Sequence, residues 1–299
     1  LYDKAKSCVR TGNKMSEYFQ CDVGVRQGEN LSPLLFALYL NDLLPFLLER
    51  TDGLSSLKSE AEKLNVSENE VDALFKMFIL LYADDTVLCA ESPADLQKAL
   101  DAMSVYCDQW QVKINVSKTK ILVFSKGKIR KLPIFTYKGE KVDIVFDFKY
   151  LGIVFNYNNK FTAAQKHLYD QASRAMFGLL RKSRKLFLPL DIQIELFNTM
   201  ISPILLYGSE IWGYQMTGLA EKLQLRYFKL LLKLGKSTPS CMVYGELGQC
   251  PLSVKAKVNL MNYWFKLVKP DDENKLSVVI YNFLFKLYEA GIYKSGFLA

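Results

Sequence analysis

The chain has 299 residues, half of them hydrophobic, and a formal net charge of +8. This length predicts roughly two domains with a sizeable core, and no apolar run approaches the roughly 18 residues that a membrane-spanning helix needs. The six cysteines lack Cys-x-x-Cys spacing, and the chain has one histidine, His167, in a basic stretch where we expect a solvated side chain. A zinc site and a hydrolase triad are therefore disfavoured. We interpret the cysteines as reduced, mostly buried residues of an intracellular protein.

Two stretches near the start of the chain favour helices. Residues 1–7 are polar and helix-like, and they contain Asp3. Farther on, Ser32 followed by Pro33 is typical of an N-cap with proline at the first helical position. The apolar residues after it predict one buried helix from about Pro33 to Glu49.

Two apolar runs flank the dipeptide Asp84-Asp85 in the segment FKMFILLYADDTVLCAES. Runs of this length with polar residues between them predict a β-hairpin. A tight hairpin turn favours Asn-Gly or Asp-Gly because it needs positive φ angles, and neighbouring carboxylates repel each other unless a cation lies between them. The pair is therefore either a solvated polar turn or a site for a divalent metal.

The rest of the chain changes from mixed to helical. Ser92 with Pro93 and Asp95 predicts a capped helix, and we expect four strands after it, at about 120–125, 134–137, 143–148 and 151–155. From Thr162 onward the pattern is helical, interrupted at Pro189, Pro203, Pro239, Pro251 and Pro270. The sequence thus predicts an α+β part and then an α part, with a turn-rich boundary near residue 158.

The charge is segregated along the sequence. Residues 42–101 carry 13 acidic and 5 basic side chains, whereas residues 113–149 carry 10 basic and 3 acidic, and residues 160–185 carry 7 basic and 1 acidic. Aromatic residues are interleaved with the basic ones, which favours binding of a phosphate backbone and stacked bases. The alternative is a solvated face. One basic cluster consists of Arg181, Lys182, Arg184 and Lys185.

Four motifs in this order resemble those of a reverse transcriptase. They are GVRQGENLSPLLFALYLNDL from Gly24, YADD ending at Asp85, KTKILVF from Lys118 and FKYLG ending at Gly152. Their order and spacing are most similar to the polymerase of a non-LTR (LINE-type) retrotransposon.

The resemblance implies a right-hand polymerase fold. Residues 1–158 would form part of the palm, an antiparallel sheet with packed helices. Residues 159–236 would form an all-α thumb, and residues 237–299 a helical C-terminal region.

The resemblance also implies an RNA-directed DNA polymerase that acts in retrotransposition and extends a DNA primer on an RNA template from deoxynucleoside triphosphates, holding the RNA–DNA hybrid. Two Mg²⁺ ions, with Mn²⁺ as a substitute, would be held by Asp84 and Asp85. Nucleotide and template contacts are implied for Arg26, Gln27, Gly28, Tyr82, Ala83, Lys118 and Lys120. A primer grip is implied for Tyr150, Leu151 and Gly152, and backbone binding for Arg181, Lys182, Arg184 and Lys185.

Several of these residues also have a plain structural interpretation. Lys118 or Lys120 would equally be an exposed strand residue, and Tyr150 and Leu151 would equally be sheet core. Gly28 would allow close approach of the backbone.

One family feature is missing. The family has a further metal-binding aspartate upstream, in a strand followed by a helix, and neither Asp3 nor Asp22 has an apolar strand before it. We therefore expect the chain to begin beyond that aspartate and to be inactive alone. Two alternatives remain: a noncatalytic nucleic-acid-binding remnant, and an intron-maturase-type polymerase. A nuclear and cytoplasmic location is expected from the resemblance.

Overall fold

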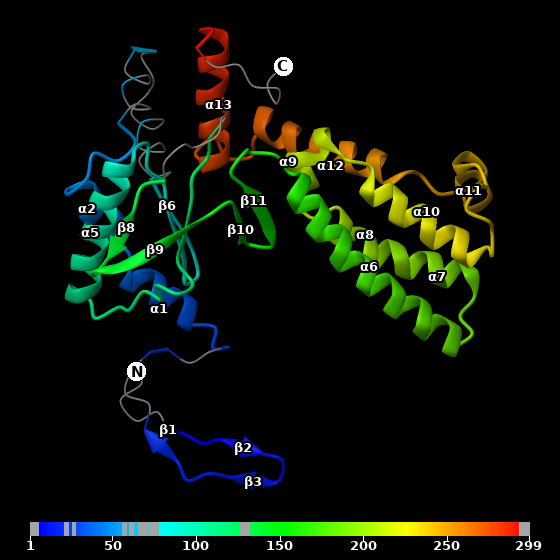
Figure 1. Cartoon of the computed structure of the whole chain (residues 1–299), viewed down its shortest axis with the longest axis horizontal. Coiled ribbons are helices and arrows are strands. Elements are labelled where there is room, and N and C mark those ends of the chain that lie inside the picture. Colours follow the sequence, from blue (N-terminus) through cyan, green and yellow to red (C-terminus); the bar gives the residue numbers. More distant parts are fainter. Residues whose placement is uncertain are drawn as a thin grey trace. The chain divides into compact units, whose positions relative to one another are not determined.

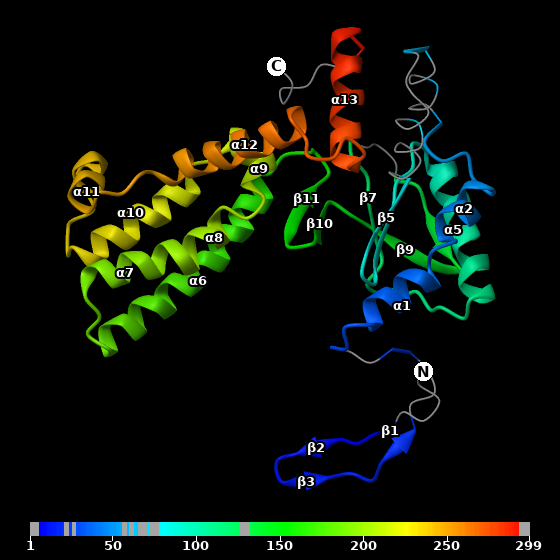
Figure 2. The same ribbon diagram turned by 180° about the vertical axis from the view of Figure 1, so that it is seen from behind.

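The computed structural model describes residues 6–20, 24–25, 28–55, 59, 63–64, 71, 78–125 and 132–292. The chain forms two compact units, residues 1–113 and residues 114–299. Helices and small sheets occur in the mixed α+β arrangement that the sequence predicts (Figures 1 and 2). In the described part of the chain, no helix has both the length and the apolar content needed to cross a bilayer.

The first unit begins with a hairpin. Strand β1 (Lys6–Ser7) pairs with β4 (Phe19–Gln20), and β2 (Arg10–Thr11) pairs with β3 (Lys14–Met15). Gly12, with φ +61°, lies in the two-residue turn between β2 and β3. The predicted helix is therefore wrong for Lys6 and Ser7, because the Gly-Asn turn lets the polar segments on either side of it pair as β-strands. Asp3 and Asp22 lie outside the described residues.

Helices α1 (Ser32–Tyr39) and α2 (Leu43–Leu48) replace the single helix expected from Pro33 to Glu49. In a continuous helix, the ring of Pro45 would clash with the carbonyl of Asn41 and provide no N–H for it. Restarting the helix places Pro45 in a first turn, where an N–H has no intrahelical partner in any case.

The two Ser-Pro pairs begin their helices differently. Ser92 caps α5 (Pro93–Gln109) as predicted, because its Oγ accepts the backbone N–H of Asp95 at 3.2 Å and donates to the Asp95 carboxylate at 2.6 Å. Ser32 is not the N-cap that the sequence predicts. The backbone of Leu31, which occupies the N-cap position, is already helical, and Ser32 is the buried first residue of α1.

The helices of the first unit pack around Tyr106. Its hydroxyl donates to Oδ1 of Asp42 at 2.7 Å, and its ring lies edge-on to Phe46 with 5.2 Å between centroids. Burial, together with the hydrogen bond to Asp42, raises the pKa of Tyr106 above its usual value. The buried apolar neighbours on α2 and α5 are Leu43, Leu47, Leu100, Met103 and Cys107.

The sheets of the second unit are short. Strands β7 (Lys120–Leu122), β9 (Glu140–Val145) and β8 (Phe135–Tyr137) form one sheet in this order, and β10 (Asp147–Tyr150) pairs with β11 (Ile153–Asn156) in a hairpin. The strand expected at 143–148 is two strands, because the carbonyl of Phe146 accepts the N–H of Tyr157 and so joins the second ladder. Among the described strands, all pairings are antiparallel except β7 with β9.

The second unit continues as helices, which Figure 1 shows from green to red. They are α6 (Thr162–Lys185), α7 (Leu190–Leu196), a π-helical turn (Phe197–Ile201), α8 (Ser202–Leu205), α9 (Ser209–Trp212), a 3-10 turn (Gly213–Gln215), α10 (Leu219–Leu231), α11 (Ser240–Leu247), α12 (Leu252–Val268) and α13 (Leu276–Glu289). Pro189, Pro239 and Pro251 each directly precede a helix, as predicted. Pro203 does not end its helix: it lacks the N–H that the Thr199 carbonyl would accept, and the chain forms the π-helical turn beside it.

The cysteines and the histidine differ from expectation. None of the five described cysteines is in a disulfide; Cys107 is buried, Cys8 and Cys89 are half-buried, and Cys241 and Cys250 are exposed. His167 is half-buried in α6, and its Nε2 is buried with no hydrogen-bond partner in the part of the chain that the structure describes, so it is not a solvated surface residue.

A buried core joins α6, the π-helical turn, α10 and α11. Phe197 stacks on Tyr227 with 4.7 Å between centroids, and burial raises the pKa of Tyr227 to about 12. The other fully buried residues of this core include Met176, Leu223, Phe228, Val243 and Leu252.

One buried polar side chain links α10 to the beginning of α12. Nε2 of Gln224 donates to the Cys250 carbonyl at 3.0 Å, and Oε1 accepts the Leu252 N–H at 3.1 Å and the Tyr244 hydroxyl at 3.1 Å. The side chain of Gln224 is fully buried. Because the first N–H groups of a helix have no intrahelical partner, Gln224 caps α12 from a neighbouring helix.

Gln224→Leu should destabilise the chain by about 2–3 kcal/mol, because it leaves buried donors and an acceptor without partners. Urea unfolding followed by circular dichroism measures the change. The matched control is Gln109→Leu at an exposed position, which should change the free energy of unfolding by less than about 0.5 kcal/mol. An equally small effect at Gln224 would contradict the capping role.

Candidate functional site

The predicted hairpin around Asp84-Asp85 is confirmed. Strand β5 (Ile79–Tyr82) pairs antiparallel with β6 (Asp85–Leu88), and Tyr82 lies opposite Asp85. Ala83 and Asp84 form the turn, and Ala83 has φ +52°. The positive φ that the turn needs thus falls on a residue with a Cβ, which costs on the order of 1–3 kcal/mol. The strained turn places Asp84 at the tip of the hairpin.

Both carboxylates are open to solvent. Asp84 and Asp85 are exposed, and neither has a hydrogen-bond or ion-pair partner among the residues that the structure describes. No group of three or more His, Cys, Asp or Glu residues capable of holding a metal occurs in the described ranges. Two carboxylates suit a hard cation that keeps waters and shares ligands with substrate phosphates, so they fit part of a Mg²⁺ donor set.

The residues before the pair are also accessible. Tyr82 is 62% exposed, and Leu80 and Leu81 on the same strand are 36% and 44% exposed. Among the described strands, β5 and β6 pair only with each other. The hairpin therefore presents both its carboxylates and an uncovered apolar surface.

In the block that begins at Gly24, Arg26 and Gln27 lie outside the described residues. Gly28 has φ +89°, and a Cβ built on it would meet no atom within 4 Å. The positive φ favours glycine there, and the predicted close approach of this backbone to a substrate stays a prediction.

The two candidate lysines differ in their partners. Lys120 on β7 forms an ion pair with Asp143 on β9, with 2.7 Å between Nζ and Oδ2, and this hydrogen bond lowers the pKa of Asp143. Lys118 is exposed in a turn built on Asn115, whose side-chain oxygen accepts the Lys118 N–H at 3.2 Å. Its ammonium has no partner in the described part of the chain, so Lys118 is the freer cation.

The turn between β10 and β11 is formed by Leu151 and Gly152, with φ +45° and +86°. Two positive φ angles are typical of a type I′ hairpin turn. Leu151 is 38% exposed and Tyr150 is half-buried, so neither is fully buried sheet core.

This turn is fixed by a residue that the sequence analysis misses. The hydroxyl of Tyr207 donates to the Leu151 carbonyl at 2.8 Å, and a Cβ on Gly152 would lie 3.0 Å from the Tyr207 ring. The Tyr207 carbonyl in turn accepts Nε1 of the buried Trp212 at 3.0 Å. The one hint in the sequence is the glycine that follows Tyr207. Gly208 has φ +74°, and a Cβ added to it would lie 3.0 Å from the Ile153 side chain.

The predicted basic cluster is exposed at the C-terminal end of α6. Because a helix turns by about 100° per residue, Arg181, Lys182, Arg184 and Lys185 lie on an arc opposite the buried Ser183. Cations at this end also complement the helix dipole. Beside them, Phe187 is 91% exposed.

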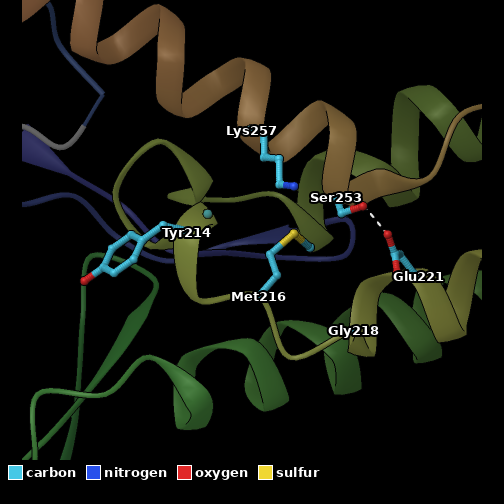
Figure 3. Close-up of a pocket in the computed structure, with 7 residues that line it drawn as sticks. Tyr214, Met216, Gly218, Glu221, Ser253 and Lys257 are labelled. Atoms are coloured by element: carbon cyan, nitrogen blue, oxygen red, sulfur yellow. Dashed lines mark hydrogen bonds between the residues drawn. The ribbon is translucent and has the colours of Figure 1, made fainter. Parts of the chain in front are cut away.

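A separate cleft of about 280 Å³ lies among the 3-10 turn, α10 and α12 (Figure 3). Glu221 on α10 accepts the backbone N–H of Ser253 at 3.3 Å there. The cleft is lined by Gly213, Tyr214, Met216, Gly218, Glu221, Ser253 and Lys257, none of them a predicted site residue.

The structure therefore forms three groups from the predicted residues: Tyr82 to Asp85 in the first unit, and, in the second, the turn at Leu151 and the cluster on α6. In the second unit, Lys120 on β7 is engaged with Asp143, and Lys118 lies in the turn just before β7.

A family model described as reverse transcriptase (RNA-dependent DNA polymerase) matches residues 3–155, just over half of the chain. The RNA-directed DNA polymerase from mobile element jockey of Drosophila funebris is 24% identical over 222 residues, which cover 71% of this chain and 22% of that protein. The probable RNA-directed DNA polymerase from transposon BS of Drosophila melanogaster is 27% identical over 218 residues, covering 69% and 21%.

The retrovirus-related Pol polyprotein from type-1 retrotransposable element R2 of Nasonia vitripennis is 27% identical over 165 residues, covering 52% of this chain and 14% of that protein. The chain thus spans about a fifth of the length of the first two relatives and less of the third. On these matches, the chain belongs to the reverse transcriptase (RNA-dependent DNA polymerase) family, of the type found in non-LTR retrotransposons.

Proposed function

We propose that the chain is the part of an RNA-directed DNA polymerase that carries the metal-binding hairpin and part of the nucleic-acid surface. The observation that carries this proposal is the exposure of Asp84 and Asp85, without any partner among the described residues, at the tip of a strained turn. Two adjacent charges with no cation beside them are unfavourable, and bound metal relieves that repulsion.

In this proposal Asp84 and Asp85 hold two Mg²⁺ ions, with Mn²⁺ as a substitute. When bound, such ions activate the primer hydroxyl and stabilise charge on the leaving pyrophosphate. The described residues supply two carboxylates, so any further protein ligand comes from outside them. Asp84 is the firmer ligand because it lies in the turn itself, whereas Asp85 begins β6.

The remaining residues bind and orient the substrates. Lys118 attracts the triphosphate of an incoming deoxynucleotide, since its ammonium is not engaged by a described carboxylate. Tyr82 and Ala83 lie beside the reacting groups, with Arg26, Gln27 and Gly28 toward the template. The turn at Tyr150, Leu151 and Gly152 contacts the primer.

The domain division follows the same proposal. Residues 1–158 form part of the palm, residues 159–236 the thumb and residues 237–299 a helical C-terminal region. The RNA template, the DNA primer and their hybrid are then held by the basic cluster on α6, which gives phosphate contacts without sequence preference.

A second candidate function is nucleic-acid binding without catalysis. It is favoured by the lack of a third acidic ligand beside Asp84 and Asp85 in the described ranges. The two candidates differ in whether templated synthesis depends on Asp84, and the first test below separates them.

Asp84→Asn should lower primer extension at least about a hundredfold in an active polymerase that contains this chain, because the amide keeps the size of the side chain but removes the charge that metal binding needs. Incorporation of labelled deoxynucleotide on an RNA template measures the loss. Asp170→Asn, an exposed position on α6, is the matched control and should extend normally. Near-normal extension by Asp84→Asn would exclude the metal role.

Lys118→Ala should raise the KM for deoxynucleotide by roughly tenfold, as expected for losing one cation near phosphate. Lys120→Ala should have a smaller effect because that ammonium is engaged with Asp143. Steady-state kinetics of both variants provide the comparison. A larger KM effect for Lys120→Ala would reverse the assignment.

Replacing the four cluster residues Arg181, Lys182, Arg184 and Lys185 by Glu should weaken binding of an RNA–DNA hybrid and flatten its salt dependence, since each phosphate contact contributes about 0.9 to the log–log slope on B-DNA. Fluorescence anisotropy across a salt series measures both effects. The control reverses Lys233, Lys236, Lys269 and Lys275, which are exposed and lie outside both basic segments, so the net charge changes equally. Equal slopes for the two variants would mean that the cluster is only a solvated face.

A further inference from the structure

Helix α12 has apolar residues on two opposite faces. One face packs against α9, the 3-10 turn and α10, and it includes Leu252, Ala256 and Leu267, which are 0%, 0% and 5% exposed. Figures 1 and 2 both show α12 running beside α9 and α10. Among the described residues, no helix covers the opposite face to the same extent.

The uncovered face is a continuous stripe. Its members are Val254, Val258, Met261, Phe265 and Val268, which are 46%, 51%, 48%, 50% and 43% exposed. We call these five residues the α12 stripe. Their spacing alternates between four and three residues, which is the heptad spacing of a helix that pairs with another helix.

The stripe differs from ordinary surface hydrophobics. Single exposed apolar residues are common, and a helix with one buried face normally has polar residues opposite it. At about 100° per residue, the five side chains of the α12 stripe fall within an arc of roughly 80° centred opposite the buried face. Trp264 borders the stripe, and its Nε1 donates to the Tyr281 hydroxyl of α13 at 3.2 Å.

The charges beside the stripe indicate what kind of helix would cover it. Lys255 and Lys257 occupy the heptad positions that flank it, one on each side, and α12 contains no acidic residue. Nζ of Lys255 donates to Asn198 at 3.0 Å, whereas the ammonium of Lys257 has no partner in the described part of the chain. Flanking charges select the partner of a heptad stripe, and a second copy of α12 would bring lysines against lysines.

We propose that the α12 stripe is a docking surface for an acidic amphipathic helix, whose apolar residues pack on the stripe and whose glutamates or aspartates pair with Lys257. This inference does not depend on polymerase activity or on the assignment of Asp84. It identifies a protein-binding surface on the helical part of the second unit.

The test uses the full chain and two designed peptides of about three heptads. Both carry leucine at the apolar heptad positions, and one has glutamate and the other lysine at the flanking positions. Fluorescence anisotropy should show that the chain binds the glutamate peptide at least about tenfold more tightly than the lysine peptide. Light scattering of the chain alone should show no self-association through the stripe.

Two sets of variants test the surface. Replacing Val258 and Phe265 together by Ser should weaken the glutamate peptide at least about tenfold, whereas replacing Val105 and Met242 by Ser, at exposed positions on α5 and α11, should leave binding unchanged. Lys257→Glu should narrow or reverse the preference between the peptides. Unchanged circular dichroism shows that each variant is folded.

Three results would overturn the proposal. The first is equal binding of the two peptides, or binding of neither. The second is a self-association that the Val258 and Phe265 double variant abolishes, which would assign the stripe to a second copy. The third is loss of hybrid binding in the same variant, which would assign it to nucleic acid.

Discussion

The candidate site depends on a backbone conformation that most side chains disfavour. At the tip of the β5–β6 hairpin, Ala83 takes the left-handed conformation that glycine would adopt at less cost. The turn is only two residues long, so Asp84 lies in the turn and Asp85 is the first residue of the returning strand. Such strain persists only where the surrounding structure enforces it, and here the paired strands do so. The same short turn that is costly for the backbone leaves both carboxylates exposed to solvent.

The second hairpin achieves its turn differently. Leu151 and Gly152 both have positive φ, but this turn is held from outside, by the Tyr207 hydroxyl on the Leu151 carbonyl and by the Tyr207 ring against Gly152. Tyr207 is itself held by Trp212. The turn at Leu151 is therefore fixed to the helices that follow it, whereas the turn at Ala83 leaves its carboxylates unpartnered among the described residues. The β10–β11 turn is thus held in place by neighbouring side chains, whereas the carboxylates of the β5–β6 hairpin are available to a ligand.

Local features of the sequence predicted local features of the structure well. The hairpin at Asp84, the cap at Ser92 and the helix starts after Pro189 and Pro251 each depend on a few neighbouring residues. The break before Pro45 was missed because the apolar pattern runs on unchanged across it.

Contacts between residues far apart in the sequence could not be predicted from such local patterns. Lys120 finds Asp143 only once β7 and β9 are paired, and nothing near Leu151 points to Tyr207. Apolar periodicity alone also cannot tell the buried face of α12 from its exposed one, because both faces carry the same kind of residue.

The π-helical turn at Phe197–Ile201 makes this region sensitive to chain length. Such a turn contains one residue more than the α-helical path it replaces, and each residue rotates the following helix by about 100°. Deleting a single residue there would restore a regular helix and rotate Tyr207 away from the Leu151 carbonyl, although no contact residue had changed. In this segment, insertions and deletions would disturb the β10–β11 hairpin more than most substitutions, because the spacing between Phe197 and Tyr207 determines where Tyr207 lies.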